Sequence, residues 1–218
     1  APFMPKVVNV DQYHCGPIYG PTGANPLNIV NNGVCVNRQG KRFIDEGKTY
    51  VQMSREVAAN TPDNWAFMVC DQTAHDIPIL KNDWASYART KAPVYTGNTL
   101  EEAAKAAGID PKALKETIED YNEAIEDGEA MKMSPVNTLP KPPVVKKAPF
   151  YIVPFQGGMT ATFGGPLINT NGQVLDTENQ VIPGLFCIGN AAGGLFYDNY
   201  VGGAQLTSAG VFGMTVAE

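Results

Sequence analysis

The last third of this 218-residue chain is almost uncharged, and this feature limits its fold and its ligands more than any other. From Ala148 to Glu218 there are 71 residues without a Lys, Arg or His, and they hold 13 of the 22 glycines. Such a segment can hold an anion only through backbone N–H groups and helix N-termini. The preceding residues are polar and carry mixed charge, so two unlike parts share one chain.

The composition fits a folded protein and excludes several classes. Hydrophobic residues make up 44% of the chain, enough for the core of one or two domains. The net charge of −6 argues against nucleic acid or an anionic membrane as a partner, because both require a surplus of Lys and Arg. The longest uncharged runs, 179–197 and 199–217, are interrupted by Gly, Asn, Gln and Thr, so no membrane span is predicted.

The cysteines and the chain ends carry weaker signals. The four cysteines form no C-x-x-C pair and have no His pair nearby, so no metal site is predicted. We interpret them as partly buried thiols in a reducing compartment, which favours the cytoplasm for this segment. The chain begins Ala-Pro-Phe and ends inside a predicted helix, and we therefore expect a fragment of a longer polypeptide.

The first half of the chain predicts strands, a loop and one helix. A short strand is expected at 6–10, and an extended loop at 13–25 because Gly and Pro recur there. A β-hairpin is expected to pair 34–36 with 42–44. A helix at 51–60 and a buried strand at 65–70 follow.

The second half predicts a helix pair, a linker and a return to strands. Thr99 and Glu102 form a capping box, Gly108 ends that helix, and Asp110-Pro111 starts a second helix that runs to Gly128. Four prolines predict a linker at 134–147. Strands are expected at 150–155, 167–170, 173–175 and 185–188, and a buried helix at 203–217.

Glycine-containing motifs follow one another in a fixed order through the last third. They are Thr162–Thr170, Val174–Asp176, Ile182–Phe186, Gly189–Gly194 and Gly202–Gly203 with the residues up to Gly213. The series resembles the C-terminal flavin-binding segment of the fumarate reductase and succinate dehydrogenase flavoprotein superfamily, which includes ketosteroid dehydrogenases. Upstream, Val36–Glu46 looks like the capping-domain hairpin of that family, and Thr99–Gly128 looks like its two-helix element. The resemblance covers nearly the whole chain.

The resemblance implies an α+β chain with a capping domain and the C-terminal segment of a Rossmann-like FAD-binding domain. Residues 1–11 would end one segment of the FAD domain, 12–147 would form the substrate-closing capping domain, and 148–218 would return to the FAD domain. The G-x-G-x-x-G motif that holds the FAD pyrophosphate between a strand and a helix is absent. We therefore expect a missing N-terminal FAD-binding portion as a partner, and little FAD binding without it.

The resemblance also implies which residues face the cofactor. A glycine lets backbone lie against FAD, and Asn190 stands where the family commonly has an acidic residue. The pair Gly202-Gly203 opens the final helix, whose positive N-terminal end would face the flavin edge. The implied cofactor-binding residues are Gly165, Gly189, Asn190, Ala204, Gln205 and Leu206.

The substrate positions depart from those of the fumarate reductases. The capping-loop His is kept as His14, whereas the Thr-Glu pair falls on Asn28 and Ile29, and a later His falls on Ala161. The two family arginines fall on Tyr50 and Tyr200. A fumarate dianion would lose its bidentate partners, so a fumarate site is not expected.

Ketosteroid dehydrogenases carry Tyr in the places that Tyr50 and Tyr200 occupy. The resemblance implies that Tyr50 transfers a proton and that Tyr200 donates a hydrogen bond to the substrate carbonyl, with Gly203 among the substrate-binding residues. The prediction is an FAD-dependent oxidoreductase of the CH–CH class that acts on a C–C bond next to a carbonyl, on a small-molecule substrate that is a neutral, apolar ketone or enone such as a ketosteroid. The sequence does not identify its redox partner. Two alternatives remain: reduction of another unsaturated acid with a carboxylate near His14, or a non-catalytic capping module.

Overall fold

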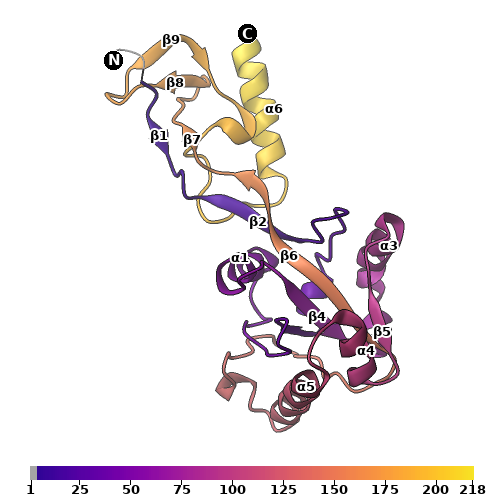
Figure 1. Cartoon of the computed structure of the whole chain (residues 1–218). Coiled ribbons are helices and arrows are strands. Elements are labelled where there is room, and N and C mark those ends of the chain that lie inside the picture. Colours follow the sequence, from indigo (N-terminus) through magenta and orange to yellow (C-terminus); the bar gives the residue numbers. More distant parts are fainter. Residues whose placement is uncertain (1–3) are drawn as a thin grey trace. The chain divides into compact units, whose positions relative to one another are not determined.

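The computed structural model describes residues 4–218, which form two compact units (Figure 1). The split unit comprises residues 4–14 and 159–218, and the insert unit comprises residues 15–158. In sequence, the insert unit therefore lies between two segments that fold together. The domain boundaries expected after residues 11 and 147, and the identities given to those domains, remain proposals. Residues 1–3 of the first expected segment lie outside the described residues.

A mainly antiparallel sheet is the centre of the insert unit. Its order is β2-β6-β4-β3, and β5 also pairs with β6. Within it, Met68 of β4 pairs with Val153 of β6 on one side and with Cys35 of β3 on the other. The strands are β2 (Tyr13–Ile18), β3 (Val34–Val36), β4 (Ala66–Cys70), β5 (Tyr95–Gly97) and β6 (Phe150–Thr162).

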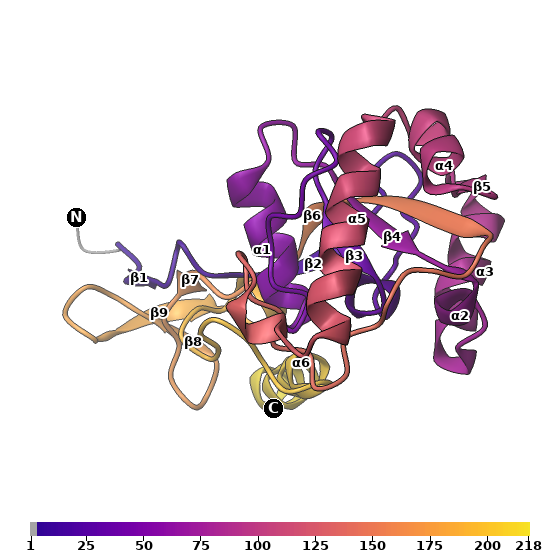
Figure 2. The same ribbon diagram turned by 90° about the horizontal axis from the view of Figure 1, so that it is seen from below.

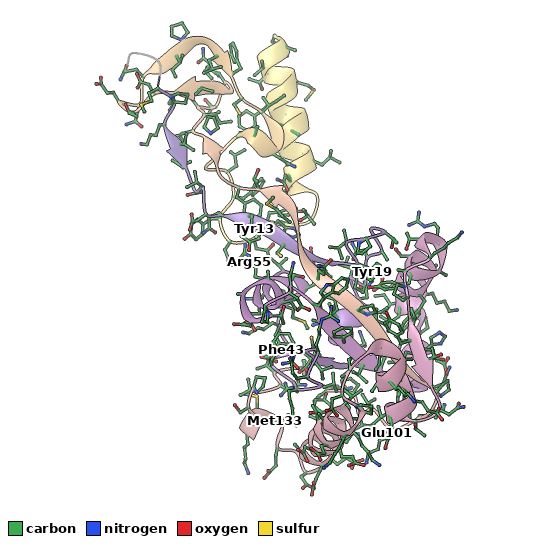
Figure 3. The ribbon with its side chains drawn as sticks, viewed as in Figure 1. Tyr13, Tyr19, Phe43, Arg55, Glu101 and Met133 are labelled. Atoms are coloured by element: carbon green, nitrogen blue, oxygen red, sulfur yellow. The ribbon has the colours of Figure 1, made fainter. Side chains whose placement is uncertain are left out.

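Helices cover both faces of this sheet, which explains why all five residues of β4 are buried. Ala66, Met68 and Cys70 join a core cluster with α1 (Tyr50–Asn60) and α3 (Lys81–Thr90). The alternate residues Phe67 and Val69 join a second cluster with α4 (Leu100–Ala107) and α5 (Pro111–Glu126). Figure 2 shows α5 lying across the sheet, and Figure 3 labels Tyr19 and Phe43 at the first cluster and Met133 at the second. The short helices of this unit are α2 (Gln72–His75), η1 (Ile29–Asn31), η2 (Pro78–Leu80) and η3 (Ala130–Lys132).

The proline-rich segment predicted as a linker lies within the insert unit and is hydrogen-bonded to its other elements. Asn122 exchanges two hydrogen bonds with the backbone of Val145, at 2.8 and 2.9 Å. The Asp71 carboxylate accepts from the amides of Lys146 and Lys147, at 3.0 and 2.9 Å. Buried acceptors of this kind hold an irregular backbone in place, so the segment is fixed to the rest of the insert unit, with Asn137 and Val145 buried.

The split unit is built from short pairings and one helix. Strand β1 (Val7–Val8) pairs with β7 (Gly165–Pro166), and β8 (Gln173–Leu175) pairs with β9 (Val181–Phe186). The turn η4 (Gly189–Ala191) precedes α6 (Ala204–Ala217). We predicted a buried final helix, and this was wrong, because α6 has no buried residue and Leu206 is 81% exposed. Within residues 4–218 the side of α6 that carries Leu206 and Met214 is exposed.

The local predictions are confirmed where they rest on capping and periodicity. Both predicted capping signals start helices, at Thr99 for α4 and at Asp110 for α5. The loop predicted at 13–25 was wrong for its first part, because Tyr13–Ile18 forms β2. This strand lies at the edge of the sheet, where Pro17 is tolerated.

Two strand predictions were only partly right. The hairpin at 34–44 keeps one bridge, between Val36 and Arg42, and 167–170 contributes isolated bridges from Leu167 and Ile168. No helix in residues 4–218 combines the length and the low polarity that a bilayer crossing demands.

Candidate functional site

Two residues singled out from the sequence meet in the split unit. The rings of His14 and Tyr200 contact edge to face, with centroids 4.8 Å apart and an interplanar angle of 62°. Phe163 lies 6.0 Å and Phe196 lies 5.8 Å from the Tyr200 ring. We call His14, Phe163, Phe196 and Tyr200 the aromatic cluster. Its members come from both segments of the split unit.

Two hydrogen bonds to Gln12, one to its backbone and one to its side chain, hold these segments against each other. The Phe163 amide donates to the Gln12 carbonyl at 3.0 Å, and the Asp198 amide donates to Gln12 Oε1 at 3.1 Å. His14 is 4% exposed and Phe163 is 1% exposed, so they form the buried base of the aromatic cluster. Phe196 and Tyr200 are half-buried, which leaves the phenol within reach of a ligand.

Thr160 of β6 is a member of this site that sequence reasoning missed. Its hydroxyl is hydrogen-bonded to His14 Nδ1, and it also donates to the His14 carbonyl oxygen at 3.1 Å. Ala161, predicted to bind substrate, is the next residue along the strand and is half-buried. The prediction for Ala161 could have drawn attention to Thr160 beside it. A threonine in a strand, however, carries no sequence signal for a functional role.

An open cavity of about 560 Å³ lies at the N-terminus of α6. Phe196 belongs both to its lining and to the aromatic cluster, so the two features are continuous. Ser208 also lines it, and the Ser208 hydroxyl oxygen is buried without a hydrogen-bond partner among residues 4–218. The other lining residues are mainly apolar: Leu195, Val201, Gly202, Gly203, Ala204, Thr207, Val211 and Phe212.

The N-terminus of α6 leaves room for a ligand to lie close to the backbone. Gly203 is the N-cap residue with a φ of +85°, and no side chain caps this end. A Cβ atom built on Gly202 or Gly203 would meet nothing within 4 Å, so the space beside them is open. Ala204, Gln205 and Leu206 form the first turn. The helix dipole makes this end favourable for negative charge.

The remaining predicted cofactor residues gather where β7 meets η4. Gly165 is required by packing, because a Cβ there would lie 2.0 Å from the Ala191 carbonyl oxygen. Gly189 has a φ of +62° and begins η4. The Asn190 carbonyl accepts from the Thr162 hydroxyl at 2.9 Å, while the Asn190 side chain is exposed. Gly165 and Gly189 have no side chain, so a side-chain contact to a ligand at this place can come only from Asn190 among the three.

Three predicted site residues belong to the insert unit. Tyr50 begins α1 after the Thr49 cap, and its ring packs at the first core cluster. The amides of Asn28 and Ile29 donate to Asp83 at 2.6 and 2.9 Å. Ile29 is 0% exposed within the core. This burial gives Ile29 a packing role, and its contact with substrate stays a prediction.

Comparison with known proteins identifies relatives of one kind. Residues 24–206 match the profile of a family described as FAD binding domain. The chain is 31% identical over 180 residues to NADH:fumarate oxidoreductase of Klebsiella pneumoniae (strain 342), covering 83% of this chain and 19% of that protein. It is 30% identical over 202 residues to 4-oxocyclohex-2-ene-1-carboxylate 5-dehydrogenase of Sinomonas cyclohexanicum, covering 83% and 34%.

Solved structures share the fold. The open conformation of a flavocytochrome c3 fumarate reductase has a TM-score of 0.79 and 26% identity, covering 98% of this chain and 37% of that one. A 3-ketosteroid delta1-dehydrogenase from Sterolibacterium denitrificans has a TM-score of 0.73 and 24% identity, covering 98% and 44%, a likeness of fold alone. The chain spans 19% and 34% of the lengths of the two curated relatives.

Proposed function

We propose, from the premise that this chain belongs to the FAD binding domain family, that it is part of an oxidoreductase acting on a carbon–carbon bond next to a carbonyl. FAD is the cofactor that the family and its flavoprotein relatives imply. The proposed substrate is a neutral, apolar ketone or enone, such as a ketosteroid. The observation that carries the proposal is the contact between His14 and Tyr200 beside the apolar cavity at α6.

The charge of the split unit supports a neutral substrate. Its one Lys or Arg among residues 4–14 and 159–218 is Lys6, whose Nζ donates to Asn179 Oδ1 at 2.8 Å. A dicarboxylate bound in this unit would lack an arginine partner. The name of the Sinomonas relative describes a ring with an enone and one carboxylate. Another unsaturated acid, with a single carboxylate near His14, is therefore the alternative substrate class.

The residues at α6 fit an FAD-binding role. The open N-terminus at Gly203, the exposed Asn190 side chain and the unpartnered Ser208 hydroxyl supply polar groups beside apolar walls. When bound, FAD supplies the acceptor or donor of hydride. The first turn, Ala204 to Leu206, would stabilise negative charge at the edge of the ligand through its N–H groups. The pyrophosphate would be held by the missing N-terminal portion.

The proposed role of Tyr200 follows from its chemistry and its place. A neutral phenol can donate a hydrogen bond to a carbonyl oxygen on which negative charge develops. The aromatic cluster around Tyr200 excludes water from one side of the phenol, which strengthens such a bond. Tyr50, in the insert unit, keeps its sequence-based role as the proposed proton-transfer residue, and that role is tested by its own variant.

The test uses the full-length protein with a ketosteroid and with fumarate. We expect turnover of the ketosteroid, little turnover of fumarate, and a loss of about 10²–10³-fold in kcat for Tyr200→Phe with FAD retained. Tyr50→Phe is assayed in parallel, with an expected loss of about 10²-fold or more. Tyr197→Phe is the matched control, because Tyr197 lies in the same loop and is 67% exposed.

Three results would separate the alternatives. Efficient reduction of fumarate would overturn the neutral-substrate proposal. A full rate in the Tyr200→Phe variant would overturn the role of that phenol. A folded, colourless full-length protein would favour the non-catalytic capping module, because bound FAD is yellow.

A further inference from the structure

Thr160 holds the ring of His14 through a pair of hydrogen bonds that place a hydrogen on Nδ1. We propose that Thr160 is a positioning residue, which keeps a hydrogen on Nδ1 of His14, so that the ring in its neutral form carries its lone pair on Nε2. The inference rests on the proposed function for its catalytic meaning. Its structural content stands on the Thr160 and His14 contacts alone.

The argument starts from the donors and acceptors available. A threonine hydroxyl has one proton to donate and lone pairs to accept. The His14 carbonyl oxygen, 3.1 Å from Thr160 Oγ1, can only accept, so the hydroxyl proton points to it. The same oxygen is bonded to His14 Nδ1, and this second bond then requires a hydrogen on Nδ1. In the opposite tautomer, Nδ1 has no hydrogen, so the Thr160 hydroxyl would donate its proton to Nδ1. The Thr160 hydroxyl oxygen and the His14 carbonyl oxygen would then face each other without a proton between them.

The packing of the ring keeps this arrangement in place. His14 is 4% exposed, and its ring lies against Tyr200 at 4.8 Å and Phe163 at 6.3 Å between centroids. A half-turn of the ring would remove Nδ1 from Thr160 and leave the hydroxyl oxygen without its donor. The buried ring therefore has a defined face, with Nδ1 toward β6 and Nε2 on the other side of the ring.

This tautomer deepens the proposed substrate class. A neutral imidazole with its lone pair on Nε2 accepts a hydrogen bond there and cannot donate one. A carboxylate oxygen needs a donor, whereas a phenol or an enol hydroxyl needs an acceptor. In its neutral form, the His14 ring held by Thr160 therefore favours hydroxyl-bearing groups over carboxylates. A site tuned in this way suits a ketone that passes through an enol-like state.

The test is nuclear magnetic resonance of the full chain with ¹⁵N-labelled histidine. The chain contains two histidines, and His75→Gln leaves the signals of His14 alone. At about pH 9, above the ordinary imidazole range, we expect the correlation pattern of a hydrogen on Nδ1 and a bare Nε2. Thr160→Val keeps the shape of the side chain but removes the oxygen, and it should shift His14 to a mixture of tautomers. Thr160→Ser keeps the hydroxyl and should restore the single tautomer.

Each outcome bears on the proposal. A hydrogen on Nε2 in the unmodified chain, or an unchanged pattern in Thr160→Val, would overturn it. Should Thr160→Val fail to fold, the unmodified chain and Thr160→Ser still decide the question. In the full-length protein, Thr160→Val should also lower kcat/KM for the neutral enone about tenfold, with recovery in Thr160→Ser. A Tyr200→Phe variant with full rate would sink the proposed function while leaving the tautomer of His14 as found.

Discussion

Asp45 is a buried carboxylate that joins two distant parts of the insert unit. It accepts from the Gly47 amide at 2.8 Å, the Thr138 amide at 2.9 Å and the Thr138 hydroxyl at 2.8 Å. Removal from water acts to raise the pKa of Asp45, but these hydrogen bonds and the charge of Arg42 outweigh it, and the pKa lies below its usual value. The ionised carboxylate therefore stabilises the proline-rich segment.

We expect Asp45→Asn to lower the free energy of unfolding of the insert unit by about 1–2 kcal/mol at pH 7. Because the folded pKa is depressed, the contribution is present above the unfolded value near 4 and is lost as pH falls through the folded pKa. The difference between the two proteins should therefore shrink in acid. Urea unfolding followed by tryptophan fluorescence measures it, since Trp65 and Trp84, the two tryptophans of the chain, lie in the insert unit. Asp120→Asn, on the exposed face of α5, is the control; an equal loss there would contradict the prediction.

At the scale of single residues, a resemblance can point to a side chain without telling what orients it. The candidate residues His14 and Tyr200 could be selected from the sequence because the motifs around them have family counterparts. Thr160 could not, since its role depends on a hydrogen bond to a residue 146 positions away. Ile29 is buried in the core, and its substrate role stays a prediction, because an apolar residue at a substrate position and one in the core look the same in a sequence.

Two aspartates that cap helices differ in what else they hold. Asp110 accepts from the amides of Lys112 and Ala113 at the start of α5 and is exposed. Asp71 accepts from two amides at the start of α2, and its second oxygen also accepts from Lys146 and Lys147. Asp71 is 3% exposed. Asp71 therefore connects a helix, the end of β4 and the proline-rich segment.

We expect Asp71→Ala to cost about 2–4 kcal/mol of unfolding free energy, because it removes the buried acceptor of four backbone N–H groups in buried or part-buried hydrogen bonds. Asp110→Ala removes a cap of the same chemistry at an exposed end and should cost about 1 kcal/mol. The matched pair is measured by urea unfolding of each variant beside the unmodified chain. Equal losses for the two variants would show that the contacts of Asp71 to Lys146 and Lys147 contribute nothing.

Elements with local signals were predictable, and those defined by a partner were not. The capping box at Thr99 and the apolar stripe of α5 act within one helix, so they are present in the sequence itself. Strand β2 contains Gly16 and Pro17 and resembles a loop until β6 lies beside it. The prolines at 134–147 predict an irregular backbone correctly, but the attachment of this segment to the rest of the insert unit depends on acceptors such as Asp45 and Asp71.

For the whole protein, the exposed apolar face of α6 supports a larger folded unit. The helix carries no charged residue from Ala204 to Ala217, and Leu206 and Met214 are 81% and 66% exposed. Contiguous apolar surface of this kind marks an interface in soluble proteins. We propose that the remainder of the FAD domain, in the longer polypeptide, covers it.

Oxidative footprinting of methionine tests this proposal. We expect Met214 to be oxidised several-fold more slowly in the full-length protein than in the 218-residue chain, because burial excludes the oxidant. Met131 is the matched control: it is 65% exposed in the insert unit and should react at the same rate in both. Equal oxidation of Met214 in the two proteins would mean that another surface receives the rest of the domain.

The sequence by itself determined the flavoprotein kinship, the helix starts at Thr99 and Asp110, and the lack of cations in the last third, because these depend on neighbours along the chain or on composition. Only the tertiary structure decided that His14 lies against Tyr200, that Thr160 orients His14, and that α6 presents an uncovered face. The physical reason is that ring contacts, hydrogen-bond partners and burial are set by segments more than a hundred residues apart, and no local pattern encodes which of them will meet.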